Sequence, residues 1–327
     1  MKEVHTYFSH LKLDIAGITE CNVMWKNVPA HCRLHEVTIG WWESLHINAA
    51  YFQQCQTALK SLAGGVAVLS INKGAHRVME QGQDPKGLGR WAWTKYRGQQ
   101  GVSLRVVVAY RPVLNKSGVL SVWNQQKVFF ESKDEDRCPR EMFVEDLCAE
   151  VVKWLAEGDQ LVIGVDANED VRSSTFGKRL KSLGLEETIT AQHGTDGPAT
   201  YNRGSRPIDG LYVSRTLRGL RCGYEKFAWD HWLLWIDIPL TIAFGQSIPP
   251  VVGWKARRLK LEDPRVVAMY QELYREYIEA NGLFKLAEQL IKEAYTLPTS
   301  EMKCRYNVLD ALQVQGMTFA EEHCRKL

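Results

Sequence analysis

Leu161-Val-Ile-Gly-Val-Asp-Ala-Asn168 is the stretch that decides the fold. Its branched apolar residues form a short run that is typical of a buried β-strand in a layered α/β protein. Asp166 and Asn168 follow two residues apart, so their side chains point to the same side of the chain. Strand ends are where such scaffolds present reactive groups. A plain turn would also place Asp and Asn here, so both interpretations stay open.

Other apolar runs also begin or end at polar side chains. A run over residues 13–18 ends near Glu20, and a run over residues 104–110 ends at Tyr110. Glu20 is a natural ligand for a hard cation such as Mg²⁺, which binds few carboxylates together with waters and phosphate oxygens. Tyr110 is equally consistent with a phosphate donor and with a partly buried strand tyrosine. These ends suggest one acidic, metal-holding site.

Two later carboxylates stand beside predicted strands. Asp209 opens an apolar run over residues 208–213, where it could also serve only as a cap or turn former. Asp230 and His231 precede the run Trp232-Leu-Leu-Trp-Ile236. An Asp can orient a His or help it hold a proton, although an Asp-His pair is also common on surfaces. The adjacent tryptophans favour the functional interpretation.

The pattern predicts many strands and few helices in the first part of the chain. Strands are expected at residues 13–18, 65–69, from 91, and at 104–110, 161–165, 208–213 and 232–238. Helices are expected at 140–156 and 176–183, where apolar residues recur every three or four positions. This composition favours two packed sheets flanked by helices over residues 1–245. A linker at 246–256 and a charged helical extension at 257–327 follow, with helices from Asp263-Pro264 and near 283–295 and 300–314.

Bulk composition is that of an ordinary globular protein. Hydrophobic residues make up 45% of the chain and the formal net charge is +3, which is too small to indicate nucleic-acid binding by itself. There is no apolar run of about 18 residues and no signal-peptide pattern at the start. The eight cysteines are scattered singly. They predict reduced, mostly buried thiols in an intracellular protein of the nucleus or cytoplasm, away from membranes.

The ordered motifs resemble the endonuclease/exonuclease/phosphatase superfamily, which includes DNase-I-like and apurinic endonucleases. The similarity covers roughly residues 10–243. It is carried, in this order, by Thr-Glu20, Gly-Gly65-Val-Ala-Val-Leu-Ser70, Ala-Tyr110-Arg-Pro112, Gly-Val-Asp166-Ala-Asn168, Ile-Asp209 and Trp-Asp230-His231. The resemblance implies a four-layered α/β sandwich with mixed sheets and a Mg²⁺-dependent phosphodiesterase, with Mn²⁺ as the alternative metal. The activity it implies is nicking of DNA through attack by water.

The same resemblance implies roles for individual residues. Glu20 would be the main metal ligand, and Asp230 would join the metal shell through water. Asp166 would activate or position the attacking water, which Asn168 would help to orient.

The remaining roles concern the phosphate. His231 would bind the scissile phosphate and stabilise its developing charge, with Asp209 supporting the imidazole. Tyr110 would contact the phosphate. Arginines near the motifs are candidates for further phosphate or DNA contacts: Arg111, Arg203 and Arg206.

One part of the superfamily pattern is not found. The pattern normally opens with a strand that ends in a metal-shell Asn, followed by a helix. Residues 1–11 resemble the end of that helix, so we expect an N-terminal truncation that puts full activity in question. Residues 254–327 resemble the connector that joins the endonuclease to a reverse transcriptase in non-LTR retrotransposon proteins. That implies a longer polyprotein with DNA, and RNA in a retroelement complex, as partners.

Two alternatives accompany the endonuclease hypothesis. A small-molecule or lipid phosphatase on the same fold would use the same site chemistry. A catalytically impaired remnant, or a binding module that keeps the fold, is favoured by the missing first strand. Fold class alone cannot choose among them.

Overall fold

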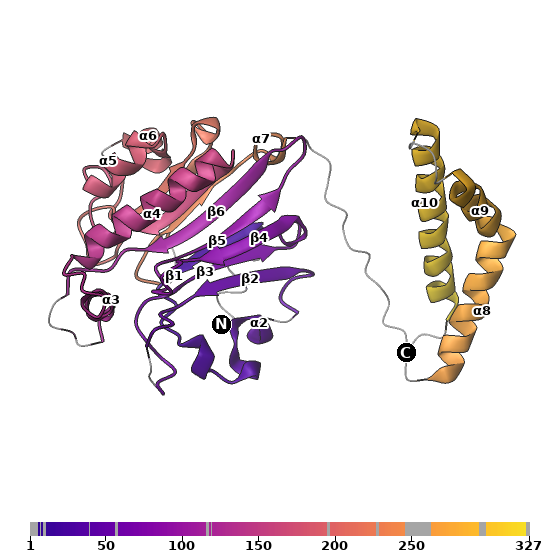
Figure 1. Cartoon of the computed structure of the whole chain (residues 1–327), viewed down its shortest axis with the longest axis horizontal. Helices are drawn as coiled ribbons and strands as arrows, with labels where there is room; N and C mark the ends of the chain where they lie inside the picture. The colour runs from indigo at the N-terminus through magenta and orange to yellow at the C-terminus, as the bar shows by residue number, and fades with distance from the viewer. Residues whose placement is uncertain are drawn as a thin grey trace. The chain divides into compact units, whose positions relative to one another are not determined.

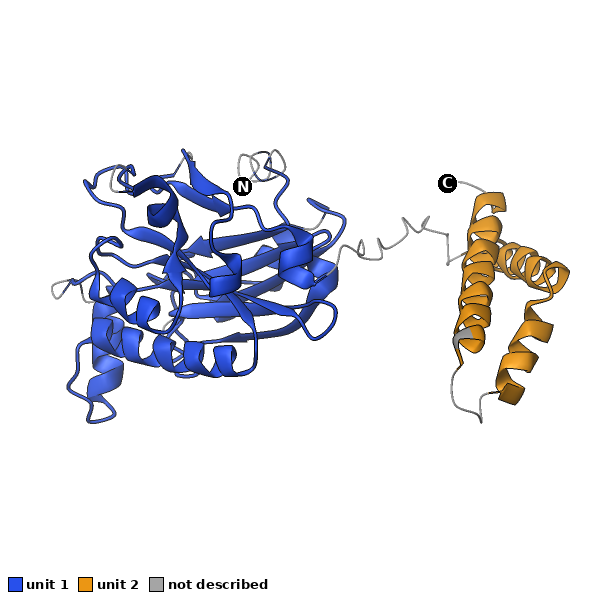
Figure 2. Ribbon diagram, turned by 90° about the horizontal axis from the view of Figure 1, so that it is seen from above, with its two compact units in different colours: residues 1–252 blue, residues 253–327 orange. Residues whose placement is uncertain are grey.

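The computed structural model describes residues 6, 8, 11–38, 40–55, 58–115, 118, 120–194, 197–226, 229–245, 263–293 and 299–324. The chain divides into two compact units, residues 1–252 and 253–327 (Figure 2). The predicted linker at 246–256 lies outside the described residues, as does most of the predicted helix end at 1–11.

The larger unit is built on a six-stranded mixed sheet with the strand order β4-β5-β6-β7-β9-β8 (Figure 1). Residues 160–166 form its central strand β7. Strands β6 and β7 run parallel, and the other neighbouring strands are antiparallel. The strands are β4 (Val78–Gln83), β5 (Trp91–Arg97), β6 (Ser103–Tyr110), β7 (Gln160–Asp166), β8 (Glu186–Glu187) and β9 (Asp209–Val213).

A second strand layer faces this sheet. It consists of an antiparallel three-stranded sheet in the order β1-β3-β2 and a separate antiparallel pair, β10 and β11. Their bounds are β1 (Ile15–Thr19), β2 (Leu45–Ala50), β3 (Val66–Ile71), β10 (Cys222–Glu225) and β11 (Leu233–Ile236). Two glycines with positive φ, Gly64 and Gly65, lead the chain into β3. A Cβ on Gly65 would approach the carbonyl oxygen of Ala50 to 2.9 Å, so glycine is required there.

Helices cover the other face of the six-stranded sheet, where α4 and α5 lie (Figure 1). The principal helix, α4, begins with a proline at its first position and is followed by Gly158, whose φ is +83°. The helices of this unit are α2 (Leu34–Val37), α3 (Val122–Glu131), α4 (Pro139–Ala156), α5 (Thr175–Ser182), α6 (Thr188–His193) and α7 (Leu240–Phe244), with 3-10 turns at Trp25–Asn27, Ala30–Cys32, Ala75–Arg77 and Arg215–Leu217. The predicted α/β sandwich is confirmed, except that the second layer is antiparallel throughout and divided into two parts.

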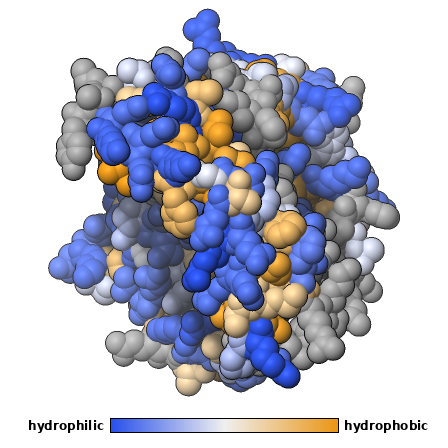
Figure 3. Space-filling model, turned by 90° about the vertical axis from the view of Figure 1, so that its right-hand side faces the viewer, coloured by the Kyte–Doolittle hydropathy of each residue, from blue (hydrophilic) through white to orange (hydrophobic). Residues whose placement is uncertain are grey.

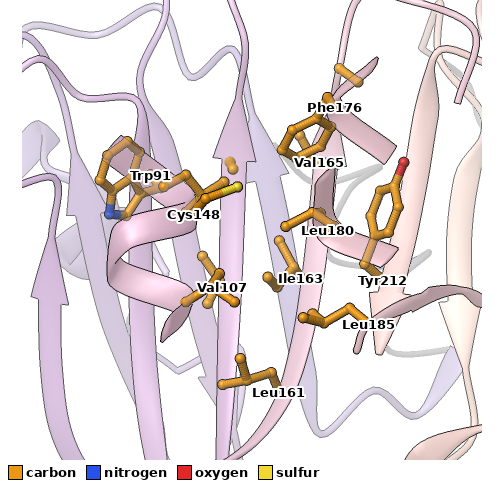
Figure 4. Close-up of a cluster of buried hydrophobic side chains, with 14 of the residues drawn as sticks. Trp91, Val107, Cys148, Leu161, Ile163, Val165, Phe176, Leu180, Leu185 and Tyr212 are labelled. Atoms are coloured by element: carbon orange, nitrogen blue, oxygen red, sulfur yellow. The ribbon is translucent and has the colours of Figure 1, made fainter. Parts of the chain in front are cut away.

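Alternation along the central strands sends side chains to two different cores. Val107 and Ile163 face the helices and pack with Phe143 and Leu147 of α4 (Figure 4 shows part of this cluster). Their neighbours one residue along, such as Val106 and Val162, face the second strand layer instead. The near-continuous apolar sequence of β7 follows from this two-sided burial.

A buried ion pair joins the sheet to the helical layer. The side chains of Arg90 and Asp84 are both fully buried. The guanidinium donates two hydrogen bonds to the Asp84 carboxylate, from Nε to Oδ2 at 2.6 Å and from Nη2 to Oδ1 at 2.8 Å. Its Nη1 donates to Asp146 of α4 at 2.8 Å. No water can replace a lost partner at this buried position. Removal of one residue of the pair alone therefore leaves a buried charge without its full compensation.

We expect Asp84→Asn to lower the free energy of unfolding of this unit by about 3–5 kcal/mol, since it leaves the Arg90 charge buried with one partner fewer. Urea unfolding measures the change. Asp237→Asn is the matched control, because the Asp237–Arg221 pair is largely exposed and should contribute no more than about 1 kcal/mol. Equal effects of the two substitutions would contradict the expectation.

The smaller unit consists of three helices, α8 (Pro264–Ala280), α9 (Leu283–Glu293) and α10 (Ser300–His323). Asp263 caps α8 by accepting a hydrogen bond from the backbone N–H of Arg265, at the predicted start. Helix α10 extends well past the predicted end at residue 314. Hydrophilic and hydrophobic residues are interspersed on the face drawn in Figure 3.

No helix among the described residues has the length and apolar character that a membrane crossing requires. All eight cysteines are free thiols. The expectation that they are mostly buried was wrong: Cys148, Cys222 and Cys324 are buried, whereas the others are partly or fully exposed. Small size lets a cysteine sit at a surface turn as readily as in a core.

Candidate active site

Three of the sequence-predicted residues come together at the end of the six-stranded sheet. The ligand atoms of Asp166, Asp209 and His231 all lie within 4.8 Å of one another. Register explains the first contact, because Asp166 at the end of β7 is paired directly with Asp209 at the start of β9. Directly paired residues of antiparallel strands place their side chains on the same face. Two carboxylates that are far apart in the sequence thus become neighbours.

Asp166 and Asn168 form a turn, and the turn also builds the site. The Oδ1 atom of Asp166 accepts the backbone N–H of Asn168 at 3.1 Å, and Asn168 has a φ of +48°. The Asn168 side chain donates from Nδ2 to the carbonyl of Arg111 at 2.8 Å. Asp166 is only 2% exposed, so this is a buried carboxylate at a strand end and not an ordinary surface turn. Asn168 fixes the loop that follows Tyr110.

His231 is positioned by the carboxylate of Asp209 and by the loop around Thr200, which was not predicted from the sequence. Its Nδ1 lies 2.8 Å from Oδ2 of Asp209. Thr200 is fully buried: its hydroxyl oxygen accepts the backbone N–H of Asp209 at 3.1 Å, and its carbonyl accepts that of Trp232 at 2.7 Å. The ring centroids of Tyr201 and His231 lie 5.0 Å apart. A lone Thr in a loop carries no sequence signal for such a role.

The electrostatics of the cluster are strongly coupled. Burial raises the pKa of Asp166 well above its usual value, and the neighbouring charge of Asp209 adds to the rise. For His231, burial disfavours the imidazolium. The hydrogen bond and charge of Asp209, with the charges of Asp166 and Asp230, outweigh burial and raise its pKa to about 9. His231, with a pKa raised toward the protonated form, therefore lies beside Asp166, a carboxyl group whose raised pKa disfavours ionisation.

In metal-free buffer we expect NMR to show His231 titrating near pH 9, and near its ordinary value of 6.5 in Asp209→Asn. Because the folded-state pKa is raised, the stabilisation by charged His231 is fully present below about pH 6.5. It is lost as the pH rises through about 9. An unchanged titration in Asp209→Asn would contradict the assigned partner.

The other predicted residues lie around this cluster and not within it. Glu20 and Asp230 are exposed at the rim, and both line the same cavity of about 1620 Å³ as the cluster. Glu20 has a φ of +50°, a conformation that is unusual for a non-glycine residue and is concentrated at functional sites. Tyr110 is buried, and its pKa is raised by that burial and by the nearby Glu20 carboxylate.

The predicted arginines divide into two kinds. Arg111 is only 6% exposed, and its Nη1 pairs with Glu169 at 2.5 Å. Arg140 of α4 also contacts Glu169, at 3.3 Å. Arg111 is thus held in a structural ion pair behind the site, and we do not retain it as a contact to substrate. Arg203 and Arg206 are exposed in the loop that follows Tyr201.

The donor set fits a hard divalent cation. Asp166 and Asp209 bring two carboxylates close together, Glu20 stands at the same cavity, and no cysteine lies in the three-residue cluster. Oxygen donors of this kind suit Mg²⁺ or Mn²⁺. Burial, and after it the charge of Asp209, raises the pKa of Asp166, and a cation bound beside it would favour its ionised form. Nucleophilic attack and charge stabilisation on a phosphate both suit this arrangement.

No family model matches this chain, and no curated protein matches it. Solved structures do. A 3′-5′ exonuclease from Neisseria meningitidis is 15% identical, with 72% of this chain and 93% of that chain covered and a TM-score of 0.47. The APE2 catalytic domain from Xenopus laevis is 14% identical, with 72% and 86% covered and a TM-score of 0.49.

A third solved structure is an endonuclease/exonuclease/phosphatase family protein from Bacteroides thetaiotaomicron. It is 12% identical, with 71% of this chain and 82% of that chain covered and a TM-score of 0.39. What this chain does therefore has to be inferred from its own residues.

Proposed function

We propose that this chain is a metal-dependent hydrolase of phosphate esters that nicks DNA. The observation that carries the proposal is the cluster of Asp166, Asp209 and His231 at one edge of the sheet, open to a cavity that Glu20 and Asp230 also line. The site combines the buried carboxylate of Asp166, the cationic imidazole of His231 and oxygen ligands for a hard cation. Those are the components that hydrolysis of a phosphodiester requires.

The residues divide the chemistry between them. Asp166, whose pKa is raised by burial and by Asp209, is suited to take a proton from water as the water oxygen bonds to phosphorus. The P–O bond to one sugar oxygen breaks as the new bond forms, and that oxygen leaves as an alcohol after taking a proton from solvent. His231, charged through its bond to Asp209, is suited to donate a hydrogen bond to a phosphoryl oxygen as negative charge develops there. A divalent cation held by Glu20 and Asp166 would neutralise further charge on the phosphate. Tyr110 lies behind this group as a hydrogen-bond donor.

DNA is the proposed substrate because of the groups on the rim. Asn202 donates its backbone N–H to the carbonyl of Asp230 at 2.7 Å and its side-chain amide to the carbonyl of Trp229 at 2.9 Å. This places the exposed loop with Arg203 and Arg206 beside the segment that carries His231, just before β11. Trp229 is 47% exposed. Arginines next to an aromatic ring suit a phosphate backbone and its bases.

The setting that we propose is a retroelement protein, in which the helical unit connects the hydrolase to a reverse transcriptase and the partners are DNA and RNA. The order of an α/β unit and a charged helical unit supports it. Genomic DNA on both sides of the coding region tests the setting: a reverse transcriptase in frame is the expected result, and unrelated reading frames would contradict it.

Incubation with supercoiled plasmid and Mg²⁺ tests the activity. We expect conversion to the open circular form, and no conversion by Asp166→Asn or after chelation of the metal. If folded wild-type protein leaves the plasmid intact but hydrolyses inositol phosphates or sphingomyelin, the phosphatase alternative replaces the proposal. If Mg²⁺ titration by calorimetry gives the same heat for wild type and Glu20→Ala, the metal assignment of Glu20 is wrong.

A further inference from the structure

The side chain of Glu20 does not follow the alternation of strand β1. Ile15 packs against the cluster that contains Tyr110 of β6, so every second residue from Ile15 onward faces the six-stranded sheet. Ala16 belongs to a cluster on the opposite face, and regular alternation would send Glu20 to that face as well. Cys21 packs there instead. The Glu20 carboxylate lies beside Tyr110, on the side of the candidate active site.

An irregularity in the strand pairing accounts for this change of face. The regular ladder between β1 and β3 ends at Thr19, and pairing resumes at Val23, which is bridged to Ser61. Between these two points, residues 20–22 stand opposite residues 62–65, so the segment before β3 has one residue more. A β-bulge of this kind bends the chain locally and re-aims a side chain. Alternation therefore stops at the end of β1.

Asn22 ties the two sides of this bulge together. Its backbone N–H donates to the carbonyl of Gly64 at 2.8 Å, and its side-chain Oδ1 accepts the N–H of Gly64 at 2.8 Å. The carbonyl of Asn22 accepts a hydrogen bond from the hydroxyl of Ser61 at 3.0 Å. Asn22 has a φ of +55°, a left-handed conformation that asparagine tolerates better than most residues. One residue thus holds both the turn and its connection to the segment before β3.

We propose that Asn22 is a positioning residue, which holds the left-handed turn at residues 20–22 and thereby directs the Glu20 carboxylate into the cavity of the Asp166 cluster. This role rests on the proposed function, in which Glu20 binds a divalent cation. Without the turn, regular alternation would return the carboxylate to the opposite face of β1. Loss of a residue that orients a metal ligand typically weakens metal binding by about 10- to 100-fold. Asn22 acts on the cation only through Glu20.

A second asparagine provides a matched control. Asn72 follows β3 at the end away from Gly64, and it has a φ of +46°. Its side-chain Oδ1 also accepts a backbone N–H, that of Glu43, at 3.1 Å. Substitution of Asn72 therefore removes the same kind of hydrogen bond from the same backbone conformation, at a position where Glu20 is not affected. A role of Asn22 that is confined to local stability would give the two sites the same behaviour.

Titration of the full chain with Mg²⁺, followed by calorimetry, tests this role without reference to activity. We expect Asn22→Ala to weaken Mg²⁺ binding by at least about tenfold, because alanine removes the acceptor and is strained at positive φ. Asn22→Gly adopts that φ without strain, so it should lose less affinity than Asn22→Ala. Asn72→Ala should bind Mg²⁺ as the wild type does, although its Tm should fall about as much as that of Asn22→Ala.

Amide exchange, followed by NMR in metal-free buffer, reports on the turn itself. We expect the N–H of Gly64 to exchange at least about tenfold faster in Asn22→Ala than in the wild type, because its acceptor is lost. The amides of β6 and β7 should keep their wild-type rates, which shows that the sheet behind the site is intact. Unchanged exchange at Gly64 would contradict the role of the Asn22 side chain.

Glu20→Ala separates a failure of this role from a failure of the proposed function. The double variant of Glu20→Ala and Asn22→Ala should bind Mg²⁺ no more weakly than Glu20→Ala alone, because Asn22 acts through Glu20. If Glu20→Ala weakens binding and Asn22→Ala does not, the positioning role is overturned and the metal assignment of Glu20 stands. If Glu20→Ala binds as the wild type does, the metal assignment is wrong and the role of Asn22 is lost with it. Equal losses of affinity in Asn22→Ala and Asn72→Ala would also overturn the positioning role.

Discussion

Asp166→Asn is expected to lower the rate of phosphodiester hydrolysis by about 10³-fold or more, the largest effect of any single change in this chain. The amide has the same shape as the carboxylate, so the turn with Asn168 is retained. It cannot take a proton from water, and it is a weaker ligand for a cation. Plasmid nicking and hydrolysis of a model phosphodiester, both at saturating Mg²⁺, measure the loss.

The thermal stability of Asp166→Asn distinguishes a loss of catalysis from misfolding. Because the pKa of Asp166 is raised in the folded protein, the ionised carboxylate opposes folding once the pH exceeds its ordinary value of 3.8. At neutral pH, Asp166→Asn should therefore leave Tm unchanged or raise it. Asp170→Asn, in the same loop, is the control and should keep the wild-type rate. A fully active Asp166→Asn variant would remove the cluster from the mechanism.

The second large effect concerns the histidine and its carboxylate. We expect His231→Gln to lower the rate by about 10²–10³-fold, because it removes a charged donor to the phosphate. Asp209→Asn should cost less, since it weakens the proton affinity of His231 without removing the ring. The double variant should be no slower than His231→Gln alone, because Asp209 acts through the imidazole.

Two measurements make this prediction specific. The pH profile of Asp209→Asn should fall at a lower pH than that of the wild type, a change that a merely structural role would not produce. His46→Gln, at an exposed position of β2, is the control and should keep the wild-type rate and pH profile. Additive losses in the double variant would show that Asp209 and His231 act independently.

Local sequence was sufficient for the elements that carry the site, because their signals are local. The apolar run before Asp166 predicts β7, and residues with helical spacing predict α4, so the sandwich could be expected from the sequence. The site residues were proposed from strand ends and from the resemblance to a superfamily. Their proximity depends on the register of β7 and β9, which is a long-range pairing with no signal in either segment alone.

Other features could not be predicted for physical reasons. Thr200 positions Asp209 and Trp232 through single hydrogen bonds, and a short polar loop around a Thr gives no indication of them. Arg111 was proposed as a phosphate or DNA contact, but its side chain is buried and Glu169 compensates its charge there. The division of the second layer depends on which edges find partners, which is a property of the whole chain.

The parallel pairing of β6 and β7 also affects when the candidate site can form during folding. It sets Tyr110 directly opposite Asp166, across a connection that includes both α3 and α4. Closing so long a loop costs chain entropy before any contact is gained, and such topologies fold slowly. The reactive end of the sheet is therefore assembled late. A nascent chain would bring Tyr110 and Asp166 together only after the crossover has closed.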